Sequence, residues 1–189
     1  MKYSIIVCYR NREEHLKKFV PAIRQHFEGK EHEIIIVEQT DNFRFQRGTL
    51  LNAGVMNGGK PIATRDILIF HDVDYLPSEM VVYWPEDIQT HVFRPIKRVQ
   101  FLNEDMTARP EADIPSGYRH FINGVDDDFF GGVTCFKRDA FLRINGFNPN
   151  YTGWGLEDAD LRERIKDGGL KVKRSESNFF YALHHADSN

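Results

Sequence analysis

The chain has 189 residues, which is the size of one domain and enough to bury a core without disulfide or metal crosslinks. Its 25 basic and 28 acidic residues give a formal charge of −3, and it contains no run of Lys or Arg that could follow a phosphate backbone. This composition argues against a nucleic-acid-binding protein. No apolar stretch approaches the ~18 residues of a transmembrane span and no signal peptide is visible, so we expect a single-domain cytoplasmic protein.

The first part of the chain alternates strand and helix patterns. Apolar, β-branched runs at residues 3–8, 33–37 and 67–70 predict three buried strands. Apolar side chains at helical spacing between residues 16 and 27 predict a helix after the first strand, and residues 46–57 predict another. Strands and helices in this alternation indicate βαβ units and a parallel sheet, so we expect an α/β fold.

The first helix carries two local signals. Asn11 followed three residues later by Glu14 is a capping-box pattern, which predicts that Asn11 caps the helix. Pro21 lies inside the apolar pattern and predicts a kink or a break, because proline lacks the backbone N–H that a helix needs there.

The second part of the chain is less regular. Residues 103–128 are polar and contain Pro and Gly, which predicts a long loop. The remaining predicted elements are strands at residues 131–136, 170–173 and 179–183 and helices at residues 138–144 and 157–167.

Two polar clusters follow predicted strands. Arg10, Asn11 and Arg12 come directly after the first strand, whereas Asp72 and Asp74 come after the third. Ligands of parallel α/β sheets bind at the carboxyl ends of the strands, so we expect both clusters at one edge of the sheet. This is the first indication of a functional site.

Asp72 and Asp74 are candidates for a metal site. Carboxylates two residues apart at a strand end project to the same side, and magnesium and manganese prefer oxygen ligands while keeping positions open for substrate phosphates. One Asp would bind the metal while the other meets a nucleotide ribose or its waters; the alternative is a solvated loop with two acids. The three consecutive Asp at residues 126–128 could also bind a metal, although a solvated turn is the commoner role of such a run.

Three arginines and one aromatic ring in the first part of the chain suit a nucleotide. Arg10, Arg12 and Arg47 carry guanidinium forks of the kind that bind phosphate or uracil carbonyls. The Phe45 ring could stack on a base. The alternative is a set of ordinary surface arginines.

The segment GWGLEDAD at residues 153–160 is the most informative. Trp154 stands between two glycines, which leaves its indole free to pack on a sugar face. Glu157, Asp158 and Asp160 fall in the first turn of the next predicted helix, where the helix dipole favours negative charge. They either cap this helix or supply one carboxylate that works as a general base.

Two adjacent histidines, His184 and His185, lie near the end of the chain. Neutral imidazole is a good ligand for manganese or zinc. Because the pair follows an apolar segment that could dock as a strand, a ligand role stands beside the simpler interpretation of a solvated tail.

Taken in chain order, these segments resemble the β-1,4-galactosyltransferase family over most of the chain. The resemblance is carried by several short motifs that occur in the family's order. They are YRNR (9–12), FQR (45–47) with LLNAG (50–54), DVD (72–74), FGGV (130–133) with INGF (144–147), and GWG (153–155) followed by Glu157 and Asp158.

The resemblance implies an inverting glycosyltransferase of GT-A type, which is a Rossmann-like mixed sheet flanked by helices in a single domain. It further implies a UDP-sugar donor and a carbohydrate or lipid-linked glycan acceptor. The implied metal is manganese, and magnesium is an alternative. Residues 1–100 would then form the donor-binding half, and residues 101–189 the acceptor-binding and catalytic half.

The resemblance also assigns roles to residues. Asp158 would be the general base, with Glu157 beside it in the catalytic group, and Trp154 would pack between donor and acceptor. The other implied assignments are Arg10, Asn11, Arg12, Phe45, Arg47, Asp72 and Val73 for the donor, Phe129 and Gly132 with Trp154 and Asp158 for the acceptor, and Asp74 with His184 or His185 for the metal.

Some positions depart from the family pattern. Ala159 and Asp126 replace residues that bind an N-acetylated acceptor in some members, and Ala182 replaces a methionine ligand. Phe129 lies where a bulky aromatic favours galactose over its N-acetylated analogue. Because the chain ends at Asn189, before the lid of the animal enzymes, we expect a compact enzyme that acts on a surface polysaccharide or, at a membrane surface, on a lipid-linked glycan.

Two other functions remain open from the sequence. A non-catalytic module that binds a UDP-sugar or glycan within a larger synthase would need no base, so Asp158 argues against it. A metal-dependent nucleotidyltransferase or phosphohydrolase would need a substrate-activating Lys or a second metal cluster at the phosphates, and only residues 126–128 could offer the latter.

Overall fold

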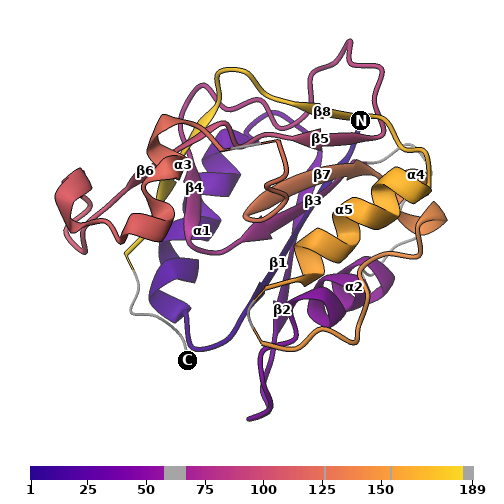
Figure 1. Cartoon of the computed structure of the whole chain (residues 1–189), viewed down its shortest axis with the longest axis horizontal. Helices are drawn as coiled ribbons and strands as arrows, with labels where there is room; N and C mark the ends of the chain where they lie inside the picture. Colours follow the sequence, from indigo (N-terminus) through magenta and orange to yellow (C-terminus); the bar gives the residue numbers. More distant parts are fainter. Residues whose placement is uncertain (58–66, 126, 154, 185–189) are drawn as a thin grey trace.

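The computed structural model describes residues 1–57, 67–125, 127–153 and 155–184. Its central feature is a mixed six-stranded sheet with the strand order β2-β1-β3-β7-β5-β8 (Figure 1). The first three strands are parallel, β7 is antiparallel to both of its neighbours, and β5 is parallel to β8. The strands are β1 (Tyr3–Tyr9), β2 (His32–Glu38), β3 (Ile67–Asp72), β5 (Val92–Arg94), β7 (Val133–Lys137) and β8 (Val172–Arg174).

A second, three-stranded sheet has the order β4-β9-β6. Its middle strand, β9, comes from the end of the chain, which confirms that the apolar segment 179–183 docks as a strand. The strands are β4 (Tyr75–Pro77), β6 (Arg98–Phe101) and β9 (Phe179–Ala182).

Helices cover both faces of the central sheet (Figure 1). α1 packs on one face together with the second sheet, and α2, α4 and α5 pack on the other. Three short helical turns lie in the segment 103–128 that was expected to be a plain loop. The helices are α1 (Glu13–His26), α2 (Arg47–Asn57), α4 (Arg138–Arg143) and α5 (Glu157–Asp167), and the short turns are η1 (Glu111–Asp113), η2 (Ser116–Tyr118) and α3 (His120–Asn123).

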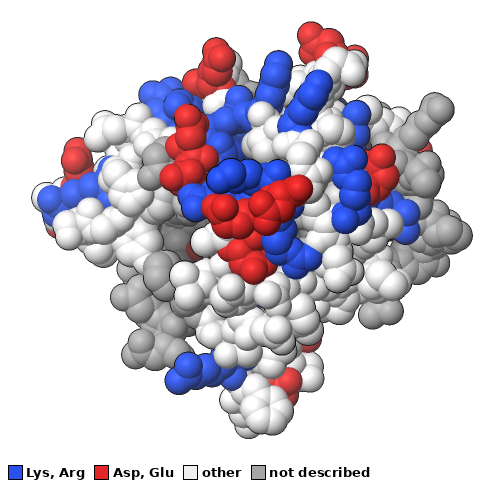
Figure 2. All heavy atoms as spheres, turned by 45° about the vertical axis from the view of Figure 1, so that its right-hand side comes forward, with Lys and Arg blue, Asp and Glu red and all other residues white. Residues whose placement is uncertain are grey.

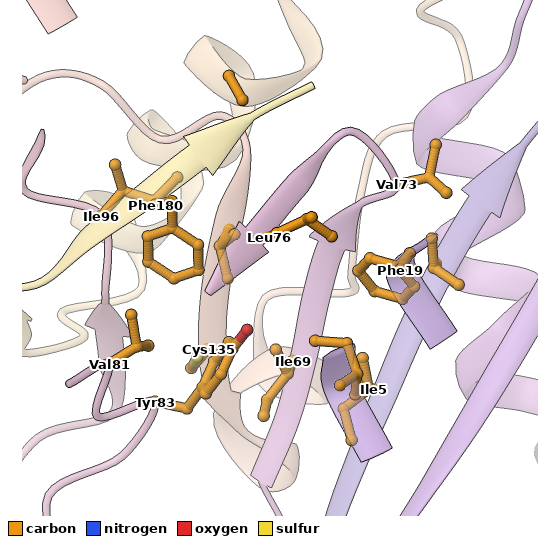
Figure 3. Close-up of a cluster of buried hydrophobic side chains, with 14 of the residues drawn as sticks. Ile5, Phe19, Ile69, Val73, Leu76, Val81, Tyr83, Ile96, Cys135 and Phe180 are labelled. Atoms are coloured by element: carbon orange, nitrogen blue, oxygen red, sulfur yellow. The ribbon is translucent and has the colours of Figure 1, made fainter. Parts of the chain in front are cut away.

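The alternation of side chains along β1 explains the two layers. Ile5 and Val7 point into the cluster that contains α1 and the second sheet, whereas Ile6 and Cys8 point into the cluster under α2, α4 and α5. Figure 3 shows the first cluster, in which Phe180 of β9 lies with residues of the central sheet. Because both faces are covered, β1 and β3 are built mainly of apolar residues that point to both sides, as the sequence predicted.

One local prediction about α1 was wrong, and of the two outcomes predicted at Pro21 the break does not occur. The helix begins at Glu13 with Arg12 at the N-cap, and no side chain caps it. Asn11 instead adopts a left-handed backbone with φ 54°, so it forms the turn out of β1. Pro21 lies inside α1, which continues without a break to His26.

No helix in the described parts of the chain has both the length and the apolar character to cross a membrane.

Candidate active site

The candidate site lies at the carboxyl end of the parallel strands, where four segments meet. β1 ends beside Arg10, and β3 ends at Asp72. Arg47 is the first residue of α2, and Asp158 is the second residue of α5. The predicted convergence of the polar clusters at one edge of the sheet is therefore confirmed.

Arg47 connects the carboxylates of this site. Its Nε donates to Asp72 Oδ1 at 2.8 Å, and its Nη1 donates to Asp158 Oδ1 at 3.0 Å. The same Nη1 lies 3.7 Å from Glu157 Oε1. The Arg47 side chain is only 12% exposed, so these are well-shielded, charge-assisted contacts. The planar guanidinium thus holds the end of β3 and the start of α5 in a fixed relation.

The charges of the site are unbalanced. Burial, with the nearby carboxylates of Asp74 and Asp158, raises the pKa of Asp72 above its usual range, and Arg47 opposes this. Burial and the Asp158 carboxylate likewise raise the pKa of Glu157. One guanidinium faces several carboxylates, so the site carries an excess of negative charge that a divalent cation would neutralise.

The DVD motif lies next to the end of the chain. β4 begins directly after Asp74, and its Tyr75 pairs with Ala182 of β9. The backbone N–H of Leu183 donates to the Asp74 carbonyl oxygen at 2.7 Å. The topology thus brings His184 close to Asp74, although the two are far apart in the sequence.

The described side chains around Asp74 and His184 do not form a complete set of metal ligands. His184 Nδ1 lies 3.7 Å from the Glu104 carboxylate, and the His184 carbonyl oxygen is 3.1 Å from His15 Nε2. Within the described residues, no three His, Cys, Asp or Glu side chains converge as a metal cluster. His185 lies outside the described residues. The donor types of Asp74 and of the histidines nevertheless fit manganese, which accepts carboxylate and imidazole ligands.

The segments that were predicted to bind the nucleotide lie together. The Arg10 guanidinium donates to the Phe43 carbonyl oxygen and lies 5.7 Å from the centre of the Phe45 ring. The Gly153 N–H donates to the Phe45 carbonyl oxygen at 2.8 Å, which joins this loop to the GWG segment. Of the other predicted donor residues, Asn11 lies in the turn after β1, whereas the side chain of Val73 is buried in the core.

Gln39 organises the loop that carries Phe45, and the sequence analysis missed it. Its buried amide nitrogen donates to Asp41 Oδ1 at 2.7 Å and also approaches two loop carbonyl oxygens, and its Oε1 accepts the Gln46 N–H at 2.9 Å. Its place directly after β2, at the same edge as the other polar clusters, is the signal that could have indicated it.

Two of the motifs that carry the family resemblance, LLNAG (50–54) and INGF (144–147), contact each other. Asn52 of the LLNAG segment donates to the Phe147 carbonyl oxygen at 2.7 Å and accepts the Phe147 N–H at 2.9 Å. Gly146, with φ 62°, has no room for a side chain, because a Cβ would lie 2.6 Å from Asn52 Oδ1. These contacts fix α2, and with it Arg47, against the INGF segment.

The 127–132 loop contains Phe129 and Gly132, two of the residues predicted to bind the acceptor. A Cβ on Gly131 would lie 3.0 Å from both Asp158 Oδ2 and the Phe129 ring, so the loop touches the candidate base. The Gly132 carbonyl oxygen accepts the Asp72 N–H at 2.8 Å. Phe129 and Gly132 thus lie beside the carboxylates, whereas their role in binding the acceptor stays a prediction. Trp154 lies outside the described residues.

The run of acids at residues 126–128 gives no support to a second metal site. Asp128 pairs with Arg162 at 2.9 Å, and its side chain is 80% exposed, while Asp126 lies outside the described residues.

Figure 2 shows acidic side chains gathered near the centre of one face with basic side chains around them. The basic side chains of the described residues form no continuous surface on this face of the kind that binds a nucleic acid.

Comparison with known proteins accounts for this arrangement. A family model described as the N-terminal region of glycosyl transferase group 7 matches residues 1–85, and one described as the N-terminal domain of galactosyltransferase matches residues 110–186. The chain belongs to the β-1,4-galactosyltransferase family.

The relatives of the chain in this family are longer. The chain is 32% identical to β-1,4-galactosyltransferase 4 of Homo sapiens, over 92% of this chain and 45% of that protein. It is 30% identical to β-1,4-galactosyltransferase 7 of Drosophila melanogaster, over 93% of this chain and 48% of that protein. The chain thus spans about half the length of these curated relatives.

Solved structures agree with the family. A variant of Drosophila β-1,4-galactosyltransferase 7, in complex with manganese, UDP-Gal and xylobiose, is 28% identical and superimposes with a TM-score of 0.74, covering 97% of this chain and 71% of that one. GalNAc-T7 with UDP, GalNAc and Mn2+, at 10% identity and a TM-score of 0.63, shares the fold alone. The predicted GT-A fold is confirmed.

Proposed function

We propose that this protein is an inverting, metal-dependent glycosyltransferase that moves galactose from UDP-galactose to a carbohydrate hydroxyl. The observation that carries the proposal is the placement of Asp158. Its carboxylate is held 3.0 Å from the Arg47 guanidinium, at the same edge of the sheet as the DVD motif and against the 127–132 loop.

Donor binding falls to the segments at the ends of β1 and β3. Arg10 and Arg12 would bind the UDP, and Phe45 would stack on its base, close to the position of Asn11. Asp72 would contact the donor sugar or ribose. Because the Val73 side chain is buried, any contact of Val73 with the donor would come from its backbone. The division into a donor half (1–100) and an acceptor and catalytic half (101–189) is part of this proposal.

Asp74, with His184 or His185, would hold the metal, which is manganese or, in its absence, magnesium. The excess of carboxylates at the site and the nearby docking of β9 support this assignment. When bound, the cation supplies Lewis-acid stabilisation of charge on the diphosphate.

The transfer follows from the position of Asp158. The Asp158 carboxylate takes the proton of the acceptor hydroxyl while the hydroxyl oxygen attacks the anomeric carbon. The bond from that carbon to the diphosphate oxygen breaks, and its electron pair leaves with UDP. Arg47 orients Asp158 and lies close enough to offset the charge that develops on the leaving group. One displacement inverts the anomeric centre, so no covalent intermediate with the enzyme is needed.

We propose a class of acceptor rather than a single compound. Phe129, Gly132 and Trp154 would bind a sugar beside Asp158, and Phe129 would favour galactose as the sugar that is transferred. A surface polysaccharide or a lipid-linked glycan is the acceptor class that we propose, and the lipid-linked form would bring a cytoplasmic enzyme to a membrane surface.

UDP release from UDP-galactose tests the function. We expect release that depends on manganese and is stimulated by at least one glycan in an acceptor panel. Asp158→Asn should lower the stimulated rate at least about a hundredfold, because it removes the base. Asp167→Asn, at the other end of α5, should leave it unchanged. UDP binding by the wild type without any stimulated release would instead favour the non-catalytic binding module.

Metal binding can be measured without turnover. We expect manganese to raise the melting temperature of the wild type, since it binds the folded state. Asp74→Asn should abolish this shift, and His184→Ala and His185→Ala should show which histidine contributes. His32→Ala, at the start of β2, is the matched control. A full manganese shift in Asp74→Asn would refute the assignment of that ligand.

A further inference from the structure

Two buried arginines lie side by side beneath the 127–132 loop. Arg94 of β5 and Arg174 of β8 are direct register partners in adjacent parallel strands. Their side chains are 7% and 8% exposed. Like charges in such positions repel each other, and burying each one costs solvation energy, so this arrangement is a poor way to gain stability.

The donor groups of both arginines converge on the backbone of the loop. Arg94 Nη1 donates to the carbonyl oxygens of Asp127 and Phe129, the latter at 3.0 Å. Arg174 Nη2 donates to the same Phe129 carbonyl oxygen at 2.6 Å, while its Nη1 donates to Ile96 at 2.6 Å. One carbonyl group thus receives two buried guanidinium donors, which fixes its position strongly.

Other contacts add to this hold. The Arg94 guanidinium lies 4.2 Å from the centre of the Phe130 ring, within the range of a cation–π contact. The Asp127 carboxylate is about 4 Å from both guanidinium groups, but its side chain is 96% exposed, so solvent screens this attraction. Among the described residues, the two arginines therefore hold the loop mainly through its carbonyl groups and the Phe130 ring.

The loop that they hold forms one wall of the candidate site. Asp158 Oδ2 and the Phe129 ring both lie so close to Gly131 that a Cβ there would be 3.0 Å from each, and the Gly132 carbonyl oxygen accepts the Asp72 N–H. A shift of the loop would therefore move two features at the same time. These are the backbone at Gly131, which lies against the candidate base Asp158, and the Phe129 ring, which would lie beside the transferred sugar.

We infer that Arg94 and Arg174 are positioning residues: they clamp the Phe129 carbonyl group and thereby set the distance of Phe129 and Gly131 from Asp158. This inference rests on the proposed function for its catalytic consequence, although the clamp itself is independent of it. Lysine cannot replace Arg174, because a single ammonium group does not offer the planar fork whose two ends reach the Ile96 and Phe129 carbonyl oxygens. In place of Arg94, lysine would lack the planar guanidinium that lies on the Phe130 ring while it donates to the loop.

The test compares Arg94→Lys and Arg174→Lys with Arg143→Lys, a matched change at an exposed arginine that also donates to a backbone carbonyl. Each variant keeps its charge and is assayed for kcat/KM with the acceptor, for the preference for UDP-galactose over UDP-N-acetylgalactosamine, and for UDP affinity. We expect both clamp variants to lose at least roughly tenfold in acceptor kcat/KM and in donor preference, since small displacements at a reacting centre are costly. UDP affinity should stay within about twofold, because the described contacts of the two arginines go to Ile96 and to the 127–132 loop rather than to the donor segments.

Hydrogen exchange at the amides of residues 127–132 tests the clamp without turnover. Exchange should be faster in both clamp variants than in the wild type or in Arg143→Lys. If the wild type transfers no sugar, the proposed function fails, while faster exchange would still support the clamp. Unchanged exchange, or faster exchange with unchanged acceptor kinetics and donor preference in an active enzyme, would overturn the inference. Loss of folding in both variants would also overturn it, because the pair would then serve the core alone.

Discussion

The guanidinium of Arg47 is the point where the carboxylates of β3 and α5 meet. The sequence suggested only that this arginine binds UDP, but the structure places it between Asp72 and Asp158 with its side chain almost buried. Although burial disfavours its charge, the carboxylates raise the pKa of Arg47 well above its ordinary value, so it stays charged. Removing it would leave these acids without compensation.

Arg47→Met should therefore destabilise the protein by about 3 kcal/mol, which is the low end for a broken buried pair because Asp72 and Asp158 are partly exposed. Urea unfolding near neutral pH measures this loss. It should shrink at mildly acidic pH, where the uncompensated carboxylates take up protons. Arg143→Met, at an exposed arginine, should change stability by less than roughly 0.5 kcal/mol. A loss as small as this control, or one that grows in acid, would refute the account of Arg47.

His71 is a buried neutral histidine beside the site. It lies between the Asp72 carbonyl oxygen and the Tyr83 hydroxyl group, at 2.9 and 2.8 Å. Burial lowers the pKa of His71 to about 4. The unfolded chain therefore binds more protons than the folded one between that value and the unperturbed value of about 6.5, and stability falls as the pH falls through this window.

His71→Gln should remove this part of the pH dependence. The wild type should lose about 3 kcal/mol more than the variant between about pH 7 and pH 4, which corresponds to the difference between the two pKa values. Urea unfolding at several pH values gives both curves, and the comparison cancels the titration of other groups. Parallel curves would mean that His71 does not titrate as described.

At the scale of the secondary-structure elements, the position of α2 depends on how closely the helix packs against the sheet. A Cβ on Gly54 would lie 2.5 Å from Ile6 Cγ2 and 3.1 Å from Val37 Cγ2, so the helix approaches β1 and β2 only because this residue is glycine. Helix propensity favours alanine over glycine by about 1 kcal/mol, but overpacking costs about 1–3 kcal/mol. The two effects oppose each other, and the close contact with buried Ile6 should win.

Gly54→Ala should thus lower the unfolding free energy by about 1 kcal/mol. Gly117→Ala is the control, because no atom lies within 4 Å of a Cβ at that position. Thermal or urea unfolding of the two variants measures the contrast. Stabilisation by Gly54→Ala would show that α2 can move away from the sheet without cost.

The sequence predicted the long elements because their patterns are local. The buried strands β1 and β3 are continuous apolar runs, and the boundaries of α5 follow from acids at its start and glycines after its end. The short strands β4, β5 and β6 were missed, since three or four residues carry no periodicity. The Asn11 cap failed because the turn after β1 takes up the residue that the pattern assigned to the helix.

The site was predictable to the extent that its residues follow strands or start helices. Asp72 and Asp158 satisfy this condition, and both lie where the sequence indicated. Arg94 and Arg174 do not, because a charged residue in a short strand is usually exposed, and only the pairing of β5 with β8 reveals that both are buried. Their contact with the Phe129 carbonyl group depends on tertiary packing.

At the scale of the whole molecule, the two parts of the chain share one sheet. β7, from the second part, lies between β3 and β5 of the first. β9 likewise lies between β4 and β6, so the end of the chain completes the second sheet beside the DVD motif. The candidate site therefore exists only when both parts are folded together, which explains how Arg47, Asp72 and Asp158 come into contact.

The central claim is that this site transfers galactose in one displacement with Asp158 as the base. The most direct test is the proton NMR spectrum of the product that the wild type forms from UDP-galactose and an accepted glycan. We predict a single new β-linked galactosyl signal, formed in step with UDP release and absent with Asp158→Asn. An α-linked product, or free galactose as the only product, would contradict the claim.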